Sequence, residues 1–140
     1  MAISFRYMKE PAKQGCIYRP KIPITLKHGT EELDVMALLD SGSDAIIIPK
    51  FLADVLKLDT RKKREVIEGV GGPVKVANAR VTIIVQKKKE KYTLPNMAVK
   101  IPLGKHAWND VLLGRIPFFQ KFDITFRENA RKVVLTRSHR

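Results

Sequence analysis

Apolar and polar residues alternate over two neighbouring stretches of the chain, 22–26 and 33–39. A two-residue period is the pattern of a β-strand with one buried face. Residues 27–30, between the two stretches, are mostly polar and include Gly29, a composition typical of a tight turn. The stretches therefore predict a β-hairpin, whose second strand ends in the continuous apolar run 36–39 and is buried there on both faces.

Short strands are predicted along most of the remaining chain, and helical periodicity is sparse. The predicted strands lie on both sides of a glycine-rich tip within 66–76, and at 81–85, 92–99, 111–113, 123–126 and 132–135. Pro49 is placed to open a helix that ends near Lys57 and has one apolar face, formed by Phe51, Leu52, Val55 and Leu56. Residues 116–122 have the pattern of one or two helical turns. Many short strands with one or two short helices predict an all-β fold, either a barrel or a sandwich.

The length of 140 residues is that of a single domain. Residues 1–20 contain Pro11 and Pro20 and are expected to form an irregular lead-in, with a short edge strand at 3–7. The folded domain is expected to span 21–137 and to leave 138–140 as a basic tail.

Composition narrows the class of protein further. Apolar residues make up 44% of the chain, enough for a core, and one cysteine excludes an internal disulfide framework. No apolar run approaches the roughly 18 residues of a membrane helix, and the N-terminus lacks the apolar segment of a signal peptide, so a cytoplasmic protein without membrane contact is expected. His28, His106 and His139 lack metal-ligand spacing, and neither a metal nor a cofactor is expected.

The chain is strongly basic, with 27 Lys and Arg against 14 Asp and Glu and a formal charge of +13. The cationic residues cluster at 61–64, 87–89 and 137–140, where loops or chain ends are expected. Few aromatic residues lie beside them to stack on bases. Nucleic acid or an acidic protein is therefore a secondary expectation for a partner.

One carboxylate stands between two strongly apolar runs, in the sequence Leu38-Leu39-Asp40-Ser41-Gly42-Ser43-Asp44 followed by the apolar run 45–48. A buried carboxylate is costly unless it is hydrogen-bonded or neutralised, and the neighbours suit that task. Gly42 allows a sharp turn, and Ser41 and Ser43 supply hydroxyl groups. Taken alone, the tetrapeptide favours an ordinary turn between two strands, which is a common structure.

Two further motifs favour a functional site over an ordinary turn. Val111-Leu112-Leu113-Gly114-Arg115 is a second apolar strand that ends at glycine, and Gly69-Val70-Gly71-Gly72 forms a glycine-rich hairpin tip between the two loops. Together the three motifs resemble those of the retropepsin-like aspartic proteases, the family of retroviral proteases and their cellular relatives. The resemblance runs from about Ile22 to Leu135 and implies a retropepsin-like acid-protease barrel with one catalytic aspartate per protomer.

The resemblance implies an aspartic endopeptidase that acts on peptide or protein substrates as a homodimer. Two Asp40 residues would meet at the twofold axis and share one proton. One carboxylate would activate a water as general base, while the protonated partner would hydrogen-bond the scissile carbonyl.

Roles for the neighbouring residues follow from the same resemblance. Ser41 is expected to brace the two loops across the twofold axis, Gly42 to face the dyad, and Ser43 to hydrogen-bond the ionised carboxylate. Asp44 and Arg115 are expected to form an ion pair near the site and the dimer contact. Leu112, Leu113 and Gly114 would form the second loop, Gly69, Val70, Gly71 and Gly72 the flap tip, and 132–135 a strand that pairs between protomers.

Other readings stay open. The chain is also compatible with a catalytically silent dimeric module that binds acidic protein or nucleic acid through its basic surface, or with a protease dedicated to one partner. Ile116 replaces a residue that is often polar in the family. The segment 104–110, which contains Trp108, has two possible places, lining the cleft or covering a sheet edge.

Overall fold

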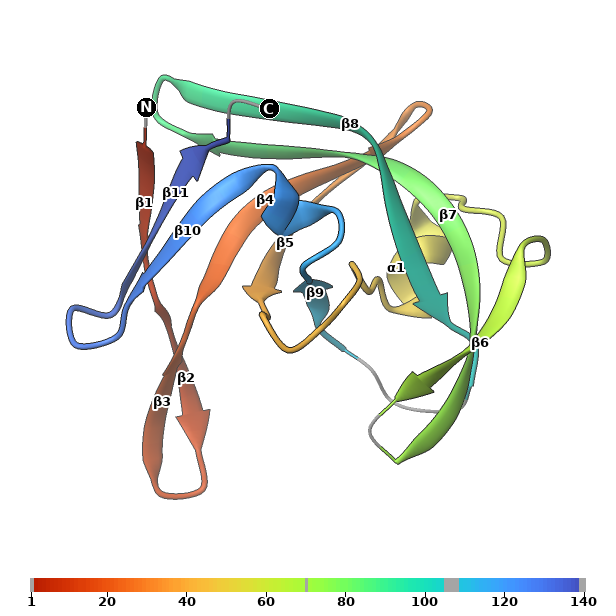
Figure 1. Cartoon of the computed structure of the whole chain (residues 1–140), viewed down its shortest axis with the longest axis horizontal. Coiled ribbons are helices and arrows are strands. Elements are labelled where there is room, and N and C mark those ends of the chain that lie inside the picture. The colour runs from red at the N-terminus through yellow and green to blue at the C-terminus, as the bar shows by residue number, and fades with distance from the viewer. Residues whose placement is uncertain (1, 70, 105–108, 139–140) are drawn as a thin grey trace.

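The computed structural model describes residues 2–69, 71–104 and 109–138. Most of the chain forms β-strands, in the arrangement of Figure 1. The strands are β1 (Ala2–Arg6), β2 (Met8–Ala12), β3 (Gly15–Arg19), β4 (Lys21–His28), β5 (Glu31–Leu39), β6 (Arg64–Gly69), β7 (Gly72–Lys87), β8 (Glu90–Pro102), β9 (Val111–Leu113), β10 (Phe122–Arg127) and β11 (Lys132–Arg137). Within the described ranges, no helix has the length and apolar character needed to cross a membrane.

The largest sheet has the order β6-β7-β4-β5-β9, with β8 also paired to β7. The predicted hairpin is β4 and β5, in which Ile24 lies opposite Val35. Sequence pattern predicted two strands where β7 is one strand of 16 residues. This strand is continuous because it pairs with β6 at its start, with β4 near its end and with β8 along much of its length.

The two ends of the chain meet in a second sheet, with the order β1-β11-β10. Leu135 of β11 lies opposite Ile3 of β1 on one side and opposite Ile124 of β10 on the other. Both edges of β11 are thus occupied within one chain. The expectation that 132–135 pairs between protomers is wrong for this arrangement, because the free edges of the sheet belong to β1 and β10.

The first twenty residues are regular, which corrects the expected irregular lead-in. The edge strand at its start is β1, and β2 and β3 form a second hairpin. The prolines are compatible with strands because Pro11 lies in a hairpin of two edge strands, where a missing N–H costs little. Gly15 has a φ of 91°, which allows the tight turn between β2 and β3.

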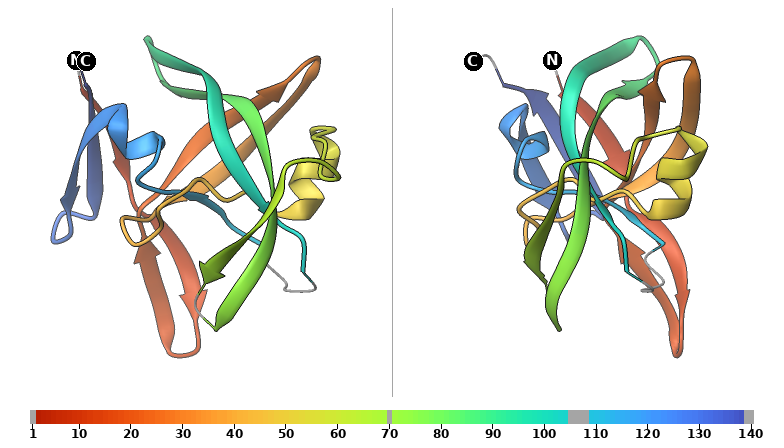
Figure 2. Two further views of the ribbon diagram at one scale, coloured as in Figure 1. Left: turned by 45° about the vertical axis from the view of Figure 1, so that its right-hand side comes forward. Right: turned by 90° about the vertical axis from the view of Figure 1, so that its right-hand side faces the viewer.

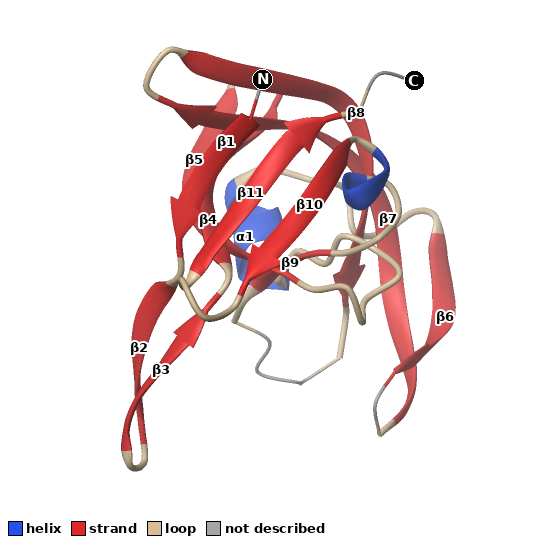
Figure 3. Cartoon of the chain, turned by 60° about the vertical axis from the view of Figure 1, so that its left-hand side comes forward, coloured by secondary structure: helices blue, strands red, loops and turns tan. Residues whose placement is uncertain are grey.

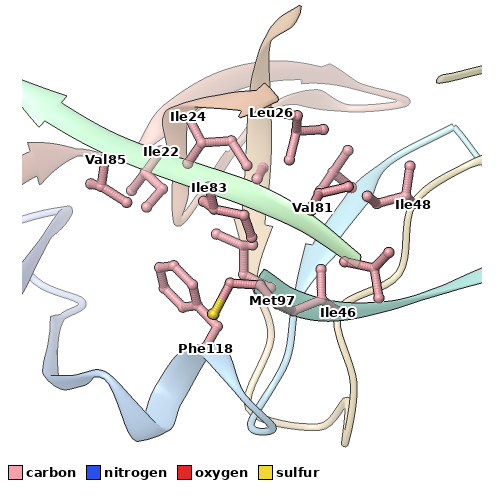
Figure 4. Packing of buried hydrophobic residues seen from close by; sticks show 14 of the residues in the cluster. Ile22, Ile24, Leu26, Ile46, Ile48, Val81, Ile83, Val85, Met97 and Phe118 are labelled. Carbon is pink, nitrogen blue, oxygen red and sulfur yellow. The ribbon is translucent and has the colours of Figure 1, made fainter. Parts of the chain in front are cut away.

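The core lies between the two sheets and draws side chains from most of the strands. Figure 4 shows Ile22, Ile24 and Leu26 of β4 together with Ile83 and Val85 of β7, and Phe118 and Met97 close to them. Phe118 opens the 3₁₀-helix η1 (Phe118–Gln120), so the helical turns predicted at 116–122 are shorter than expected.

The predicted helix after Pro49 is α1 (Lys50–Val55). Its buried face agrees with the expected one at Leu56 and at the partly buried Leu52, and differs from it elsewhere. Ala53 and, just beyond the helix, Leu56 are fully buried, whereas Phe51 and Val55 are about half exposed, at 54% and 52%. In a helix of six residues, less than two turns, the direction in which the loops attach it decides which side packs on the sheet.

Candidate active site

Asp40 is the first residue after β5 and lies half-buried at the end of that strand. Its N–H donates to the carbonyl of Leu113 in β9 at 3.1 Å, and its carbonyl accepts from the N–H of Ser43 at 3.2 Å. The backbone N–H of Gly42 donates to Oδ1 of Asp40 at 2.9 Å. A short turn therefore orients the carboxylate through its own backbone.

Two strand ends and a crossing segment hold this turn in place. β9 runs parallel to β5, with Leu112 opposite Leu38. The segment after the turn crosses β9, where Ile47 and Leu112 exchange two backbone hydrogen bonds of 2.9 and 3.0 Å. Buried apolar residues in the segment after the turn and in β9 pack this crossing tightly. The Asp40 turn therefore cannot move independently of the loop that follows β9.

Gly114 is the closest point of that crossing. A Cβ at this position would lie 2.1 Å from the carbonyl oxygen of Ala45 and 2.6 Å from that of Ser43. The next residue, Arg115, donates its N–H to the carbonyl of Ser43 at 2.8 Å, and Ile116 donates to that of Asp44 at 3.0 Å. Glycine is required here because two backbones approach to within the space of one methyl group.

The two serines of the turn differ in environment. Ser41 is exposed, as a residue expected to contact a second protomer would be. Ser43 donates its hydroxyl to the carbonyl of Ala45 at 2.8 Å. The expected bond from Ser43 to the Asp40 carboxylate is therefore absent in this protomer, because the hydroxyl turns back onto its own loop.

Asp44 and Arg115 are brought together across the same crossing. Arg115 Nη1 lies 3.5 Å from Oδ1 of Asp44, and the two side chains are 62% and 85% exposed. At this separation and exposure, the pair contributes little to the stability of a single protomer. Ile116, next along the chain, is 56% exposed, so this part of the surface is partly apolar.

The predicted flap is the hairpin of β6 and β7. Gly69 lies opposite Gly72, and Gly71 and Gly72 have φ values of 97° and 121°, which only glycine adopts freely. Val70 at the tip lies outside the described residues. At the other end of β6, Asn78 and Lys100 donate side-chain hydrogen bonds to Glu65, and these bonds lower the pKa of its carboxyl. The root of the hairpin is thereby fixed to β7 and β8, while Gly69 and Gly71 near its tip are exposed.

Sequence analysis missed a cluster around Lys21, which lies opposite Leu38 of β5. Lys21, at the start of β4, is 7% exposed, and its Nζ donates to Glu10 at 2.5 Å and to Asp110 at 3.2 Å. Burial alone lowers the pKa of Lys21, but the two carboxylates outweigh it and raise the pKa above its ordinary value. No local pattern points to this cluster because the two carboxylates are 11 and 89 residues away in sequence.

Asp110 is the end of the segment 104–110 whose place the sequence left open. It lies against β4 through Lys21, directly before β9. Trp108 lies outside the described residues. Among the described residues, no group of three or more His, Cys, Asp or Glu side chains is arranged to hold a metal ion.

Comparisons with known proteins agree with this geometry. A family model described as aspartyl protease matches residues 22–115. The chain is similar to the crystal structure of a retropepsin-like aspartic protease from Rickettsia conorii, with a TM-score of 0.64 and 17% identity over 96% of this chain and 98% of that one. It is also similar to the EIAV protease complexed with the inhibitor HBY-793, with a TM-score of 0.50 and 26% identity over 69% of this chain and 82% of that one. A comparison with curated protein sequences found no match.

The region matched by the family model begins in β4 and ends at Arg115. It therefore contains the Asp40 turn, the hairpin of β6 and β7, and the crossing with β9. The structural similarity covers more of the chain, 96%. The chain thus belongs to the aspartyl protease family, and its fold is the retropepsin-like all-β fold predicted from the three motifs.

Proposed function

We propose that the protein is an aspartic endopeptidase that works as a homodimer, with the two Asp40 carboxylates facing each other at the twofold axis. One observation carries the proposal. Asp40 lies at the end of a buried strand, its carboxylate held by the N–H of Gly42, and the chain contains a single Asp-Ser-Gly sequence. General acid–base hydrolysis needs two such carboxylates, so the second must come from another protomer.

The chemistry follows from the pairing. Two adjacent carboxylates hold one proton between them, because both cannot ionise easily at short range. The ionised carboxylate removes a proton from a water molecule, and the water oxygen bonds to the scissile carbonyl carbon. The protonated carboxyl gives its proton to the carbonyl oxygen. The resulting gem-diol loses its C–N bond as one carboxyl passes a proton to the departing amine, while the other, ionised carboxylate takes a proton from a gem-diol hydroxyl; a carboxylic acid is left and the dyad again holds one proton.

The substrate is proposed to be an extended peptide between the Asp40 turn and the hairpin of β6 and β7. A glycine-rich tip leaves backbone N–H and C=O groups free of bulky side chains, so it can hydrogen-bond an extended chain as a strand does. Closure of this hairpin would exclude water from the site. The 3.5 Å pair of Asp44 and Arg115 lies beside the turn and would contact residues next to the scissile bond.

A direct test is cleavage of a diverse peptide library from about pH 3 to 7, the range in which carboxylates titrate, by the wild-type chain and by Asp40→Asn. The variant keeps the size of the side chain and removes its charge. Cleavage by the wild-type chain alone is the expected result. Equal cleavage by both proteins would refute the assignment of Asp40.

A second candidate function rests on the basic surface. Lys87, Lys88 and Lys89 are exposed around the turn between β7 and β8, and Lys91 follows them. Such a cluster would bind acidic protein or nucleic acid by charge. This function predicts that Asp40→Asn binds a polyanion as tightly as the wild-type chain does and that neither protein cleaves peptides.

A further inference from the structure

The hairpin of β2 and β3 stands away from the body of the protomer. Figures 1 and 2 show it projecting from the lower end of the molecule, the end from which the hairpin of β6 and β7 also extends. Most of its residues are exposed, including Met8 at 37% and Ile17 at 41%. A two-stranded hairpin is marginally stable by itself, so its exposed apolar side chains are unexplained within one protomer.

The root of this hairpin is fixed to the catalytic turn. The carbonyl of Pro20, the residue after β3, accepts a hydrogen bond of 3.0 Å from the N–H of Leu39, the residue before Asp40. Glu10 of β2 accepts from Arg19 at 2.9 Å and from the buried Lys21 at 2.5 Å. Lys21 also binds Asp110, just before β9. The hairpin is therefore anchored at its root and as far along β2 as Glu10.

The two faces of the hairpin have different surroundings. Cross-strand pairing places Tyr18 opposite Lys9, and the Arg131 guanidinium lies 3.7 Å from the centre of the Tyr18 ring. This face is turned toward its own chain. Ile17 lies opposite Glu10 and points to the other face, which it shares with Met8 and Ala12. That second face also carries Glu10 and Arg19, whose ion pair lies beside Lys21, so its exposed apolar side chains are Met8 at the root and Ile17 in the middle of the hairpin.

The position of the hairpin relative to the proposed twofold axis indicates what covers its exposed apolar side chains. In a dimer whose Asp40 carboxylates share a proton, the hydrogen bond between Leu39 and Pro20 places each hairpin root within about 15 Å of the twofold axis, since consecutive Cα atoms are about 3.8 Å apart. Five residues of strand extend about 17 Å. Figure 3 shows the hairpin running away from its own sheets, beyond the end of β1. An element of this length that starts near the axis and leaves its own body is long enough to reach the partner protomer.

We propose that the β2–β3 hairpin is a dimer arm that packs its Met8 and Ile17 face on the partner protomer and thereby ties dimerisation to the catalytic turn. This inference rests on the proposed homodimer. The arm adds buried apolar surface to the interface. Because its root is bonded to Leu39 and Lys21, the contact with the partner also restrains these two residues. Formation of the dimer would in this way fix the two Asp40 turns relative to each other.

The test compares Ile17→Asp with a matched control, Val55→Asp. Val55 is also apolar and exposed, at 52%, but lies on α1 away from the arm. The dimer dissociation constant is measured by sedimentation equilibrium and by the loss of specific activity on dilution. Ile17→Asp should raise that constant at least about tenfold, because two copies of the side chain are affected in each dimer, while Val55→Asp stays near the wild-type value.

The alternatives give different results. If Ile17→Asp dimerises like the wild-type chain and only its KM rises, the arm holds substrate and the proposal is overturned. If dimerisation and KM are both unchanged while Asp40→Asn is inactive, the arm proposal fails and the proposed function stands. A wild-type chain that stays monomeric at all concentrations overturns both. Ile17→Ser, which removes the apolar group without adding charge, should weaken the dimer in the same direction as Ile17→Asp.

Discussion

Gly114→Ala is the most sensitive perturbation of the crossing that holds Asp40. The added Cβ would lie 2.1 Å from the carbonyl oxygen of Ala45 and 2.6 Å from that of Ser43, both backbone atoms. To relieve the overlap, the chain at Ala45 must move by about 1 Å in a closely packed region. The same two carbonyls accept hydrogen bonds from Ser43 Oγ and from the N–H of Arg115, each at 2.8 Å.

The expected loss of stability combines these effects. Overpacking of a tight site costs about 1–3 kcal/mol, and the two disturbed hydrogen bonds are worth about 1 kcal/mol each. A reduction of about 4 kcal/mol in the free energy of unfolding follows, a large part of the roughly 5–15 kcal/mol of an ordinary domain. With a urea m-value of about 2 kcal/mol/M, the unfolding midpoint should fall by about 2 M.

Urea unfolding followed by circular dichroism measures this shift, and Gly29→Ala provides the control. Gly29 lies in the turn between β4 and β5 with a φ of 59°, and a Cβ there would meet no atom within 4 Å. Its substitution costs only the left-handed backbone conformation, about 1 kcal/mol. If Gly114→Ala unfolds at the same urea concentration as Gly29→Ala, the close backbone contact at Gly114 is not what holds the Asp40 turn in place.

Three further substitutions test the site. Gly42→Ala would place a Cβ 3.2 Å from Oδ1 of Asp40, so kcat should fall on the order of tenfold through displacement of the carboxylate, with little change in the urea midpoint; unchanged kcat would contradict the assigned orientation. Ser43→Ala removes the bond to Ala45 and should cost about 1 kcal/mol in unfolding without moving the acidic limb of the pH–rate profile, since the hydroxyl does not reach Asp40. Lys21→Met should cost about 1–2 kcal/mol in unfolding, because Arg19 still compensates Glu10 and Asp110 is about half exposed. The pKa of Lys21 is raised in the folded chain above its ordinary 10.5, so its contribution is complete below that pH and is lost as pH rises through the folded value. The stability difference between Lys21→Met and the wild-type chain should therefore narrow in alkaline urea titrations, and a constant difference would contradict this role of Lys21.

The parts of the fold that sequence predicted are those with a local cause. Alternation of apolar residues located β4 and β5, and the apolar run before glycine located β9. The Asp40 turn could be singled out because a carboxylate between two apolar runs is costly without a specific arrangement around it, but its expected role came only from the resemblance that the three motifs carry together. Its contact with the loop at Gly114 was not visible, because the approach of two backbones depends on tertiary packing.

The parts that sequence missed had a misleading local pattern or depend on partners distant in the chain. The prolines at 11 and 20 indicated irregular structure, but β2 and β3 pair with each other as a hairpin. Lys21 gave no signal because one of its carboxylates lies 89 residues away. β11 had the pattern of any strand, and only the closure of the sheet around it by β1 and β10 makes it central.

Subunit mixing tests the central claim most directly, because it counts the Asp40 residues in one active site. Wild-type chain and Asp40→Asn are combined in equal amounts, allowed to exchange subunits, and assayed on a peptide cleaved by the wild-type chain. If two Asp40 carboxylates form the site, only dimers of two wild-type chains are active, and the rate falls to about one quarter of that of the same total amount of wild-type protein. A rate of about one half would show that each protomer acts alone and would contradict the shared dyad.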